Sequence, residues 1–280
     1  MLKLRVLTAV TAVPLILWAL LAWSVVGWCV LLAIVMLLGA WEWAALLQWS
    51  SRLARVVYVM TLAVVLAASG YWVQVDSAWA HAVLWAASIF WAWALLEIAI
   101  SKNIHSGFLM SPLWRPLSGL LVLYPAWLAL VLLRLQPQGE WLTFFFLFLV
   151  WGADVGAYFA GHQFGRTKLA PHVSPGKTWE GVAGGLIVTL LLSAGAGYFG
   201  FHFTGSVLLA WVFTGLMVAL VSVLGDLHES RLKRAAGVKD SGTLVPGHGG
   251  MLDRIDALTS AAPFFVLAWV ITLRTDGVVA

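Results

Sequence analysis

Charged residues are scarce in this 280-residue chain, because aspartate, glutamate, lysine and arginine together make up only 10% of it. A soluble domain carries about one charged residue in four. Apolar residues account for 62% of the chain and the mean hydropathy is +0.95, which leaves too little polar surface to cover a water-soluble fold. The same composition excludes an intrinsically disordered protein. The sequence therefore predicts a protein that is embedded in a lipid bilayer.

Cysteine is almost absent as well. The single Cys29 lies inside an apolar stretch, which excludes an intrachain disulfide framework and a cysteine-rich metal site. The formal net charge is only +4, and the basic residues form no continuous run. This charge pattern gives no support to a nucleic-acid partner.

Apolar stretches of the length that crosses a bilayer are abundant. A hydrocarbon core about 30 Å thick requires about 20 helical residues, and nine such stretches are found. They are Val6 to Trp23, Gly27 to Leu47, Leu53 to Val73, Ala78 to Ile100, Arg115 to Leu133, Trp141 to Ala160, Gly181 to Phe201, Gly205 to Leu227 and Ala257 to Leu273. We therefore expect an all-α polytopic membrane protein with about nine transmembrane helices, divided into a region of about five spans at 1–140 and a catalytic region at 141–280.

The distribution of lysine and arginine indicates how the chain is oriented. If nine spans are assumed and the N-terminus is cytoplasmic, 14 of the 16 basic residues fall on the cytoplasmic side. Only Arg134 and Arg274 fall on the other side. By the positive-inside rule this bias favours a cytoplasmic N-terminus.

Two expected cytoplasmic segments differ from the short, plain loops elsewhere. Residues 154–180 and 226–256 contain most of the functional groups, and their loop portions are predicted at 161–180 and 228–256. The second segment holds ten of the 28 charged residues within 31 positions, together with two histidines and a glycine cluster. These segments are the places with enough functional groups for chemistry.

Acidic residues in the second segment recur at helical spacing. Asp226, Glu229 and Ser230 share one face if the eighth helix continues. Asp253 and Asp256 open the ninth span at the same spacing of three residues. Carboxylates without thiols suit Mg²⁺ or Mn²⁺, and Mg²⁺ is usually held by one or two carboxylates plus substrate phosphates. The alternative is that these acids cap helices and form loop salt bridges.

Three further acids lie within or at the ends of apolar spans. Asp154 lies about 13 residues into the sixth span, so its side chain should face a polar cavity or the metal site, or pair with a basic residue. Glu42 and Glu97 have featureless surroundings and are interpreted as interfacial residues.

Basic residues and glycine-rich turns accompany the acids. Lysines and arginines this close to metal-binding carboxylates fit a ligand with several phosphates, although anionic lipid headgroups would attract them too. The turns at 174–178 (SPGKT) and 246–250 (PGHGG) let backbone N–H groups approach a phosphate closely, but neither has Walker A spacing. The residues alone therefore indicate a membrane enzyme that handles a polyphosphate substrate with a divalent metal.

The same residues carry a resemblance to a known family. SRLKR at 230–234, KD at 239–240 and PGHGGMLDRID at 246–256 resemble the signature of the phosphatidate cytidylyltransferase (CDP-diacylglycerol synthase) family. Residues 154–161 and 174–181 are similar to further blocks of that family, whereas residues 1 to about 140 match only in being multi-span. Val155 and Val245 depart from the usual Thr and Ile or Leu without removing a charged group.

The resemblance implies an activity. Transfer of CMP from CTP to phosphatidate would yield CDP-diacylglycerol and pyrophosphate for phospholipid biosynthesis, with Mg²⁺ required. It also implies a second, monovalent cation such as K⁺, a homodimer, and an active site at the cytoplasmic face of a bacterial-type inner membrane.

Roles for individual residues follow as hypotheses. The expected metal ligands are Asp226 and Asp253, supported by Asp256, Glu229 and Asp154. Catalytic and phosphate-holding residues are expected to be Asp226, Lys233, Arg234, Lys239, Asp240, His248, Asp253 and Arg254. Substrate contacts are expected from Ser174, Lys177, Thr178, Ser230, Gly249 and Gly250.

Two other classes of membrane protein fit the sequence less well. A CDP-alcohol phosphotransferase would need a D-G-x-x-A-R motif, which the sequence lacks. A cation or phosphate transporter would place ionisable groups near the bilayer midplane, often in paired repeats, whereas here the acids gather at one side.

Overall fold

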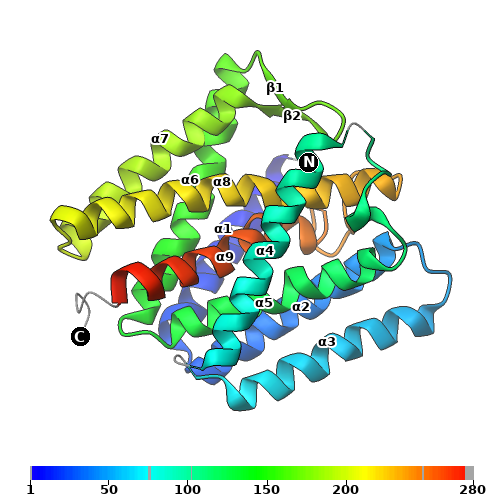
Figure 1. Ribbon diagram of the computed structural model, residues 1–280, viewed down its shortest axis with the longest axis horizontal. Coiled ribbons are helices and arrows are strands. Elements are labelled where there is room, and N and C mark those ends of the chain that lie inside the picture. Colours follow the sequence, from blue (N-terminus) through cyan, green and yellow to red (C-terminus); the bar gives the residue numbers. More distant parts are fainter. Residues whose placement is uncertain (1, 75–76, 102, 248, 275–280) are drawn as a thin grey trace.

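The computed structural model describes residues 2–74, 77–101, 103–247 and 249–274, with side chains described within 10–271. Over these residues the chain forms nine α-helices and one two-stranded sheet (Figure 1). The elements are α1 (Leu2–Ala22), α2 (Val25–Leu46), α3 (Arg52–Trp72), α4 (Ala78–Ile100), the 3₁₀ turn η1 (Phe108–Met110), α5 (Trp114–Arg134), α6 (Gly139–Phe164), β1 (Lys168–Ala170), β2 (Ser174–Thr178), α7 (Trp179–Gly195), the π-helical turn η2 (Ala196–Gly200), α8 (Gly205–Ala235), α9 (Leu252–Ala268) and the π-helical turn η3 (Trp269–Arg274).

The prediction of a helical, polytopic membrane protein is confirmed. Within the described residues, eight helical segments are long and apolar enough to cross a bilayer, beginning with α2 and ending with α9. The described apolar part of α1 is shorter and covers Val10–Ala22. The structure adds the small β1–β2 hairpin, which the sequence did not predict.

The helices that carry the two polar segments are longer than expected. α6 runs four residues beyond the predicted end at Ala160, and α8 continues past Leu227 to Ala235. α9 begins at Leu252, before the predicted start at Ala257. Hydropathy marks only the part of a helix that lies in hydrocarbon, whereas the added ends of α8 and α9 are stabilised by polar contacts of their own.

One hydrophobic core joins the two regions of the chain. α5 and α9 are the most deeply buried spans and pack against each other, while α8 covers α9 (Figure 1). α6 and α7 lie close enough that a Cβ at Gly156 would come within 2.7 Å of the Gly184 carbonyl oxygen. Such small residues let membrane helices approach closely.

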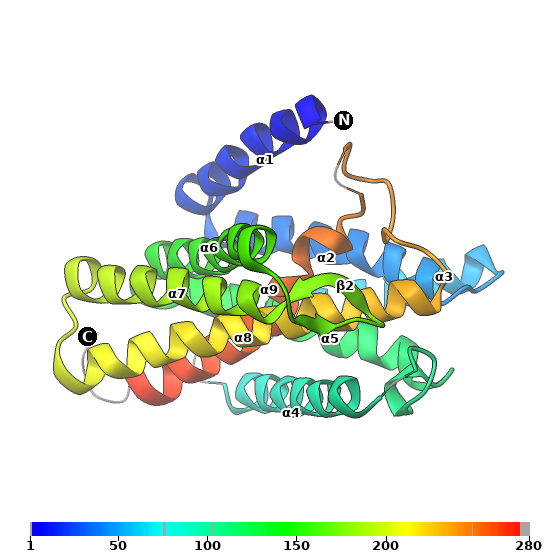
Figure 2. The same cartoon turned by 90° about the horizontal axis from the view of Figure 1, so that it is seen from above.

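The hairpin, α1 and the segment between α8 and α9 lie near the end of the bundle where the two polar segments gather. The hairpin pairs β1 and β2 in antiparallel fashion and leads directly into α7 (Figure 1). Figure 2 shows α1 standing off the other helices, on the same side as the segment that joins α8 to α9. These features bring the N-terminal helix, the hairpin and the α8–α9 connection around one end of the molecule.

Candidate functional site

The C-terminal extension of α8 beyond its apolar part carries four polar side chains at helical spacing. The Ser230 hydroxyl donates a hydrogen bond to Asp226 Oδ1 at 3.0 Å. Glu229 and Lys233 are also four residues apart, and Lys233 Nζ lies 3.4 Å from Glu229 Oε1. Side chains three and four residues apart are neighbours on a helix surface, so these contacts stabilise the extension of α8 beyond its apolar part. The predicted common face is therefore present.

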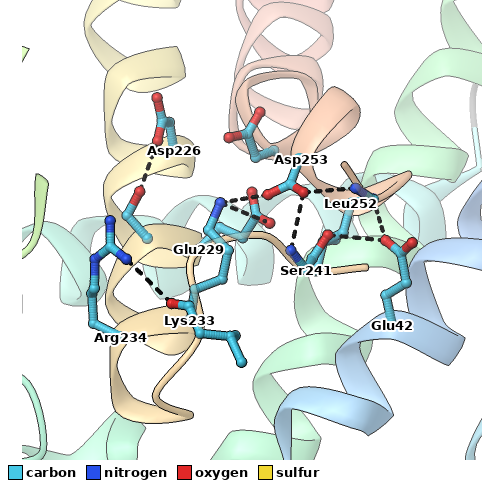
Figure 3. Close-up of polar contacts among 12 residues, drawn as sticks. Glu42, Asp226, Glu229, Lys233, Arg234, Ser241, Leu252 and Asp253 are labelled. Carbon is cyan, nitrogen blue, oxygen red and sulfur yellow. Dashed lines mark hydrogen bonds and ion pairs between the residues drawn. The ribbon is translucent and has the colours of Figure 1, made fainter. Parts of the chain in front are cut away.

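Asp253, in the first turn of α9, is held from several directions (Figure 3). Its Oδ1 lies 2.6 Å from Lys233 Nζ of α8. Its Oδ2 accepts hydrogen bonds from the backbone N–H groups of Ser241 at 3.0 Å and Gly250 at 2.8 Å. Gly249 has a φ of 88°, and a Cβ there would come within 2.8 Å of Asp253 Oδ2, so the close turn requires glycine. The carboxylate is thus fixed by its surroundings.

Asp226 has a more open environment. Its Oδ2 forms an ion pair with Lys177 Nζ at 2.7 Å, and Lys177 comes from strand β2 of the hairpin. The Lys177 ammonium also donates to the Val223 carbonyl oxygen at 3.4 Å. The side chains of Lys177 and Asp226 retain 24% and 35% of their exposure, respectively. This pair connects the hairpin to α8 at the edge of the site.

Three more carboxylates complete the acidic cluster. Asp256 and Glu229 lie beside each other, and Asp154 lies close enough to Asp226 and Arg254 to interact with them electrostatically. Neither oxygen of the buried Glu229 accepts a hydrogen bond from the described residues. Over the part of the chain that the structure describes, no three acidic, histidine or cysteine side chains are gathered closely enough to hold a metal ion by themselves.

A cavity of about 450 Å³ opens beside these acids. One end is lined by Asp154, Asp253, Arg254 and Asp256. The rest is lined mainly by apolar side chains of α1, α2, α5, α6 and α9. A second hollow of about 560 Å³ beside α6 and α7 is lined by aromatic and aliphatic side chains with Gln138 as the polar member, and none of its lining residues in the described part of the chain is charged. The first cavity is therefore the one in which charge and apolar surface meet.

The remaining predicted residues fall in several environments. Lys239 and Asp240 are exposed on the α8–α9 segment, and Arg234 donates to the Val238 carbonyl oxygen at 3.2 Å. Ser174 is half-buried at the start of β2. Thr178 is buried, and its hydroxyl accepts a hydrogen bond from the Gly181 N–H as the N-cap of α7. His248 lies outside the described residues.

Of the interpretation of Glu42 and Glu97 as interfacial residues with featureless surroundings, the featureless surroundings are wrong, because both side chains are buried against specific partners. Glu42 on α2 accepts hydrogen bonds from the Ser241 hydroxyl and from the N–H groups of Met251 and Leu252 (Figure 3). Glu97 on α4 forms an ion pair with Arg231 at 2.9 Å. An acid inside an apolar span suggests a functional or paired group, and that signal could have identified both.

Arg231 is a structural anchor of α8 and lies apart from the acids that line the cavity. Besides Glu97, its guanidinium donates to the carbonyl oxygens of Ile104 and Ser106. Glu97 in turn accepts from the Leu109 N–H at 3.0 Å. These contacts tie α8 to α4 and to the segment that follows it.

Comparison with known proteins identifies the family of the chain. The model of the cytidylyltransferase family matches residues 3–272 of this chain. The phosphatidate cytidylyltransferase of Pseudomonas aeruginosa is 43% identical over 271 residues, which cover 96% of this chain and 97% of the relative. That of Haemophilus influenzae is 37% identical over 95% of this chain and 97% of its own length. The protein of the same name from Bacillus subtilis is 41% identical over 140 residues, or about half of each chain.

A match over nearly the whole length means that the spans, the hairpin and the acidic cluster are compared together and not as an isolated motif. On this basis the chain belongs to the cytidylyltransferase family.

Proposed function

We propose that this protein is a phosphatidate cytidylyltransferase, which transfers CMP from CTP to phosphatidate and so forms CDP-diacylglycerol and pyrophosphate for phospholipid biosynthesis. The full-length relatives of that name support the assignment. The observation that carries it is the cavity in which Asp154, Asp253, Arg254 and Asp256 meet an apolar wall. A lipid with a phosphate headgroup has the same division between charge and hydrocarbon.

The shape of the cavity suits the lipid substrate. Trp28, Leu32 and Met36 of α2 contribute apolar lining, and α1 closes one side through Val13 and Ile16. Acyl chains that leave the bilayer for this lining stay in an apolar environment, so the wall can accept them without a desolvation cost. Arg254 at the charged end can hold a phosphate through its fork of donors.

The reaction is a displacement at phosphorus. A phosphate oxygen of phosphatidate attacks the α-phosphorus of CTP, a new P–O bond forms, and the bond to the pyrophosphate oxygen breaks with its electron pair on the leaving group. The protein therefore acts mainly by positioning the two substrates and neutralising their charge. No covalent intermediate with the protein is needed.

The donor set fits Mg²⁺, or Mn²⁺ in its place. Asp226 and Asp253 are the proposed ligands, with Asp256, Glu229 and Asp154 beside them. All of these are hard oxygen donors, and the Glu229 oxygens accept no hydrogen bond from the described residues. Because Mg²⁺ usually combines one or two carboxylates with substrate phosphates, the absence of a tighter cage among the described residues agrees with a site completed by CTP. The ion would neutralise charge on the phosphate oxygens.

Basic and glycine-rich elements supply the other proposed contacts. Lys177, Arg234, Lys239 and Arg254 hold phosphates, and Lys233 keeps the Asp253 carboxylate in place. Further roles are proposed for Ser174, Thr178, Ser230, Asp240, His248, Gly249 and Gly250. Of these, Gly250 presents its N–H to Asp253.

The proposal includes where the protein works and in what assembly. The bias of lysine and arginine supports an active site at the cytoplasmic face of an inner membrane. A homodimer and a second, monovalent cation such as K⁺ belong to the proposal through the family resemblance.

The test is a reconstituted reaction. Purified protein in mixed micelles is supplied with phosphatidate, CTP labelled in its α-phosphate, and Mg²⁺. We expect labelled CDP-lipid that disappears when phosphatidate is omitted or the metal is chelated. A protein that instead consumes CDP-lipid would be a phosphotransferase, and sealed vesicles that accumulate an ion without CTP would indicate a transporter; either result rejects the proposal.

A further inference from the structure

Glu42 of α2 contacts the catalytic region far from it in sequence. Its Oε2 accepts hydrogen bonds from the Ser241 hydroxyl at 3.0 Å and from the Leu252 N–H at 2.8 Å. Its Oε1 accepts from the Met251 N–H at 3.0 Å. The side chain is 3% exposed, so these three bonds replace hydration that the carboxylate has lost.

These hydrogen bonds provide acceptors for backbone N–H groups at the start of α9. Met251 occupies the N-cap position and provides no side-chain cap hydrogen bond of its own. Glu42 accepts the N–H groups of Met251 and Leu252 instead, which otherwise lack helical partners. A carboxylate at this position also interacts favourably with the helix dipole. The first turn of α9, which contains Asp253, is therefore fixed from α2.

Glu42 and Asp253 hold the same residue from opposite sides (Figure 3). Glu42 binds the Ser241 hydroxyl, whereas Asp253 Oδ2 binds the Ser241 backbone N–H at 3.0 Å. The packing leaves little freedom, because a Cβ at Gly250 would come within 2.5 Å of Glu42 Oε2. The buried Glu42 carboxylate thus binds both ends of the segment 241–252, at Ser241 and at Met251 and Leu252.

We infer that Glu42 is a positioning residue: it fixes the segment 241–252, and through it the Asp253 carboxylate, in the geometry needed for metal and phosphate binding. Glu42 itself lies behind the segment and outside the residues that line the cavity. The inference rests on the proposed function for its effect on activity, but its effect on the segment is independent of that function.

The experiment compares Glu42→Gln with Glu97→Gln as a matched control. Both variants remove the charge of one buried carboxylate on a span of the N-terminal region, but Glu97 binds Arg231 and the Leu109 N–H and does not contact the segment 241–252. Each protein is purified in detergent and its folded fraction is measured by size-exclusion chromatography. Two properties are then recorded.

The first property is trypsin cleavage after the exposed Lys239, followed by mass spectrometry in the absence of substrates. We expect Glu42→Gln to be cut at least about tenfold faster than the wild type, because a protease needs a locally unfolded stretch around the bond, and releasing the adjoining segment 241–252 makes this unfolding easier. The second property is the Mg²⁺ concentration that gives half-maximal CDP-lipid formation. We expect it to rise at least about fivefold in Glu42→Gln. Both properties should stay near wild-type values in Glu97→Gln.

Two results overturn the inference. One is folded Glu42→Gln with the wild-type cleavage rate after Lys239. The other is faster cleavage with an unchanged Mg²⁺ requirement, which would make Glu42 an anchor of the segment without a role in the site.

If Glu42→Gln does not fold, the same two measurements on Ser241→Ala test the inference. This substitution removes one of the three hydrogen bonds and leaves the Ser241 N–H to bind Asp253. We expect shifts of two- to fivefold in the same directions, and wild-type behaviour contradicts the inference. If the wild type forms no CDP-lipid, the proposed function fails, while the cleavage rates still show whether Glu42 fixes the segment.

Discussion

Two lysine–aspartate pairs bracket the candidate site, and they differ in how firmly they are held. Asp253–Lys233 and Asp226–Lys177 have nearly equal N···O distances of 2.6 and 2.7 Å. The Asp253 side chain is 6% exposed and accepts two backbone N–H groups as well. The Asp226 side chain is 35% exposed, and among the described residues its hydrogen-bond and ion-pair partners are the Ser230 hydroxyl and Lys177. Distance alone would make the pairs equivalent, but their surroundings make one fixed and the other exchangeable.

The difference suggests separate tasks for the two pairs. Lys177 lies on a short hairpin and can leave Asp226 without disturbing the helix core. Lys233 lies on α8 between Glu229 and Asp253. If it moved away, these two buried carboxylates would lose their shared cation and repel each other. We therefore expect the inner pair to maintain the site and the outer pair to open when phosphates bind.

The largest expected effect comes from Asp253→Asn. An amide neither attracts Lys233 nor provides a metal ligand of equal strength, so CDP-lipid formation should fall at least about 10³-fold, which corresponds to about 4 kcal/mol in the barrier. Losing one partner of a buried pair should also lower the free energy of unfolding by up to about 3 kcal/mol. Labelled-CTP assays and thermal unfolding measure the two losses, and a rate within tenfold of wild type would reject the role of Asp253.

Asp226→Asn should have a smaller and different effect. Activity is expected to fall about 10²-fold because a proposed metal ligand is weakened, while the unfolding temperature barely changes. Partly exposed ion pairs contribute less than about 1 kcal/mol, so stability should survive the substitution. The same assays apply, and a loss of stability equal to that of Asp253→Asn would mean that the two pairs are not distinct.

Lys177→Gln should have the smallest effect on activity. It should lower turnover and raise the affinity for Mn²⁺. Turnover is expected to fall about tenfold, because a phosphate contact is lost. Affinity for Mn²⁺ without CTP should rise about threefold, because Lys177 no longer competes with the cation for Asp226. Electron paramagnetic resonance of bound Mn²⁺ measures the affinity, with Lys177→Arg as the control that keeps the charge. Equal or weaker Mn²⁺ binding in Lys177→Gln would show that Lys177 and the metal do not share Asp226.

The sequence predicted which candidate side chains lie close together where spacing along one element determines proximity. Asp226 and Ser230 lie about one helical turn apart, as do Glu229 and Lys233, so a helix brings each pair together whatever the rest of the fold does. Asp253 and Asp256 follow the same rule at the start of α9. Pattern and composition were sufficient for these residues and for the helical class of the fold.

The contacts that the sequence missed join distant elements. Glu42 is separated from its partners on α9 by 209 and 210 residues, and Arg231 is separated from Glu97 by 134. No local period relates such residues, because only the packing of α2 on α9 and of α4 on α8 brings them together. The hairpin was missed because its strands are only three and five residues long and the longer one, β2, contains proline and glycine.

The uninterrupted length of α8 has a consequence for how the protein sits in its membrane. At 31 residues the helix is about 46 Å long, whereas the hydrocarbon layer is about 30 Å thick. If it stands upright, about a third of the helix therefore protrudes from the hydrocarbon, and the protruding end begins near Asp226. A single unbroken helix thus connects the membrane-embedded part of the protein to the candidate site. Any change in bilayer thickness that tilts this helix also changes the height at which a water-soluble nucleotide and a membrane-bound lipid are brought together.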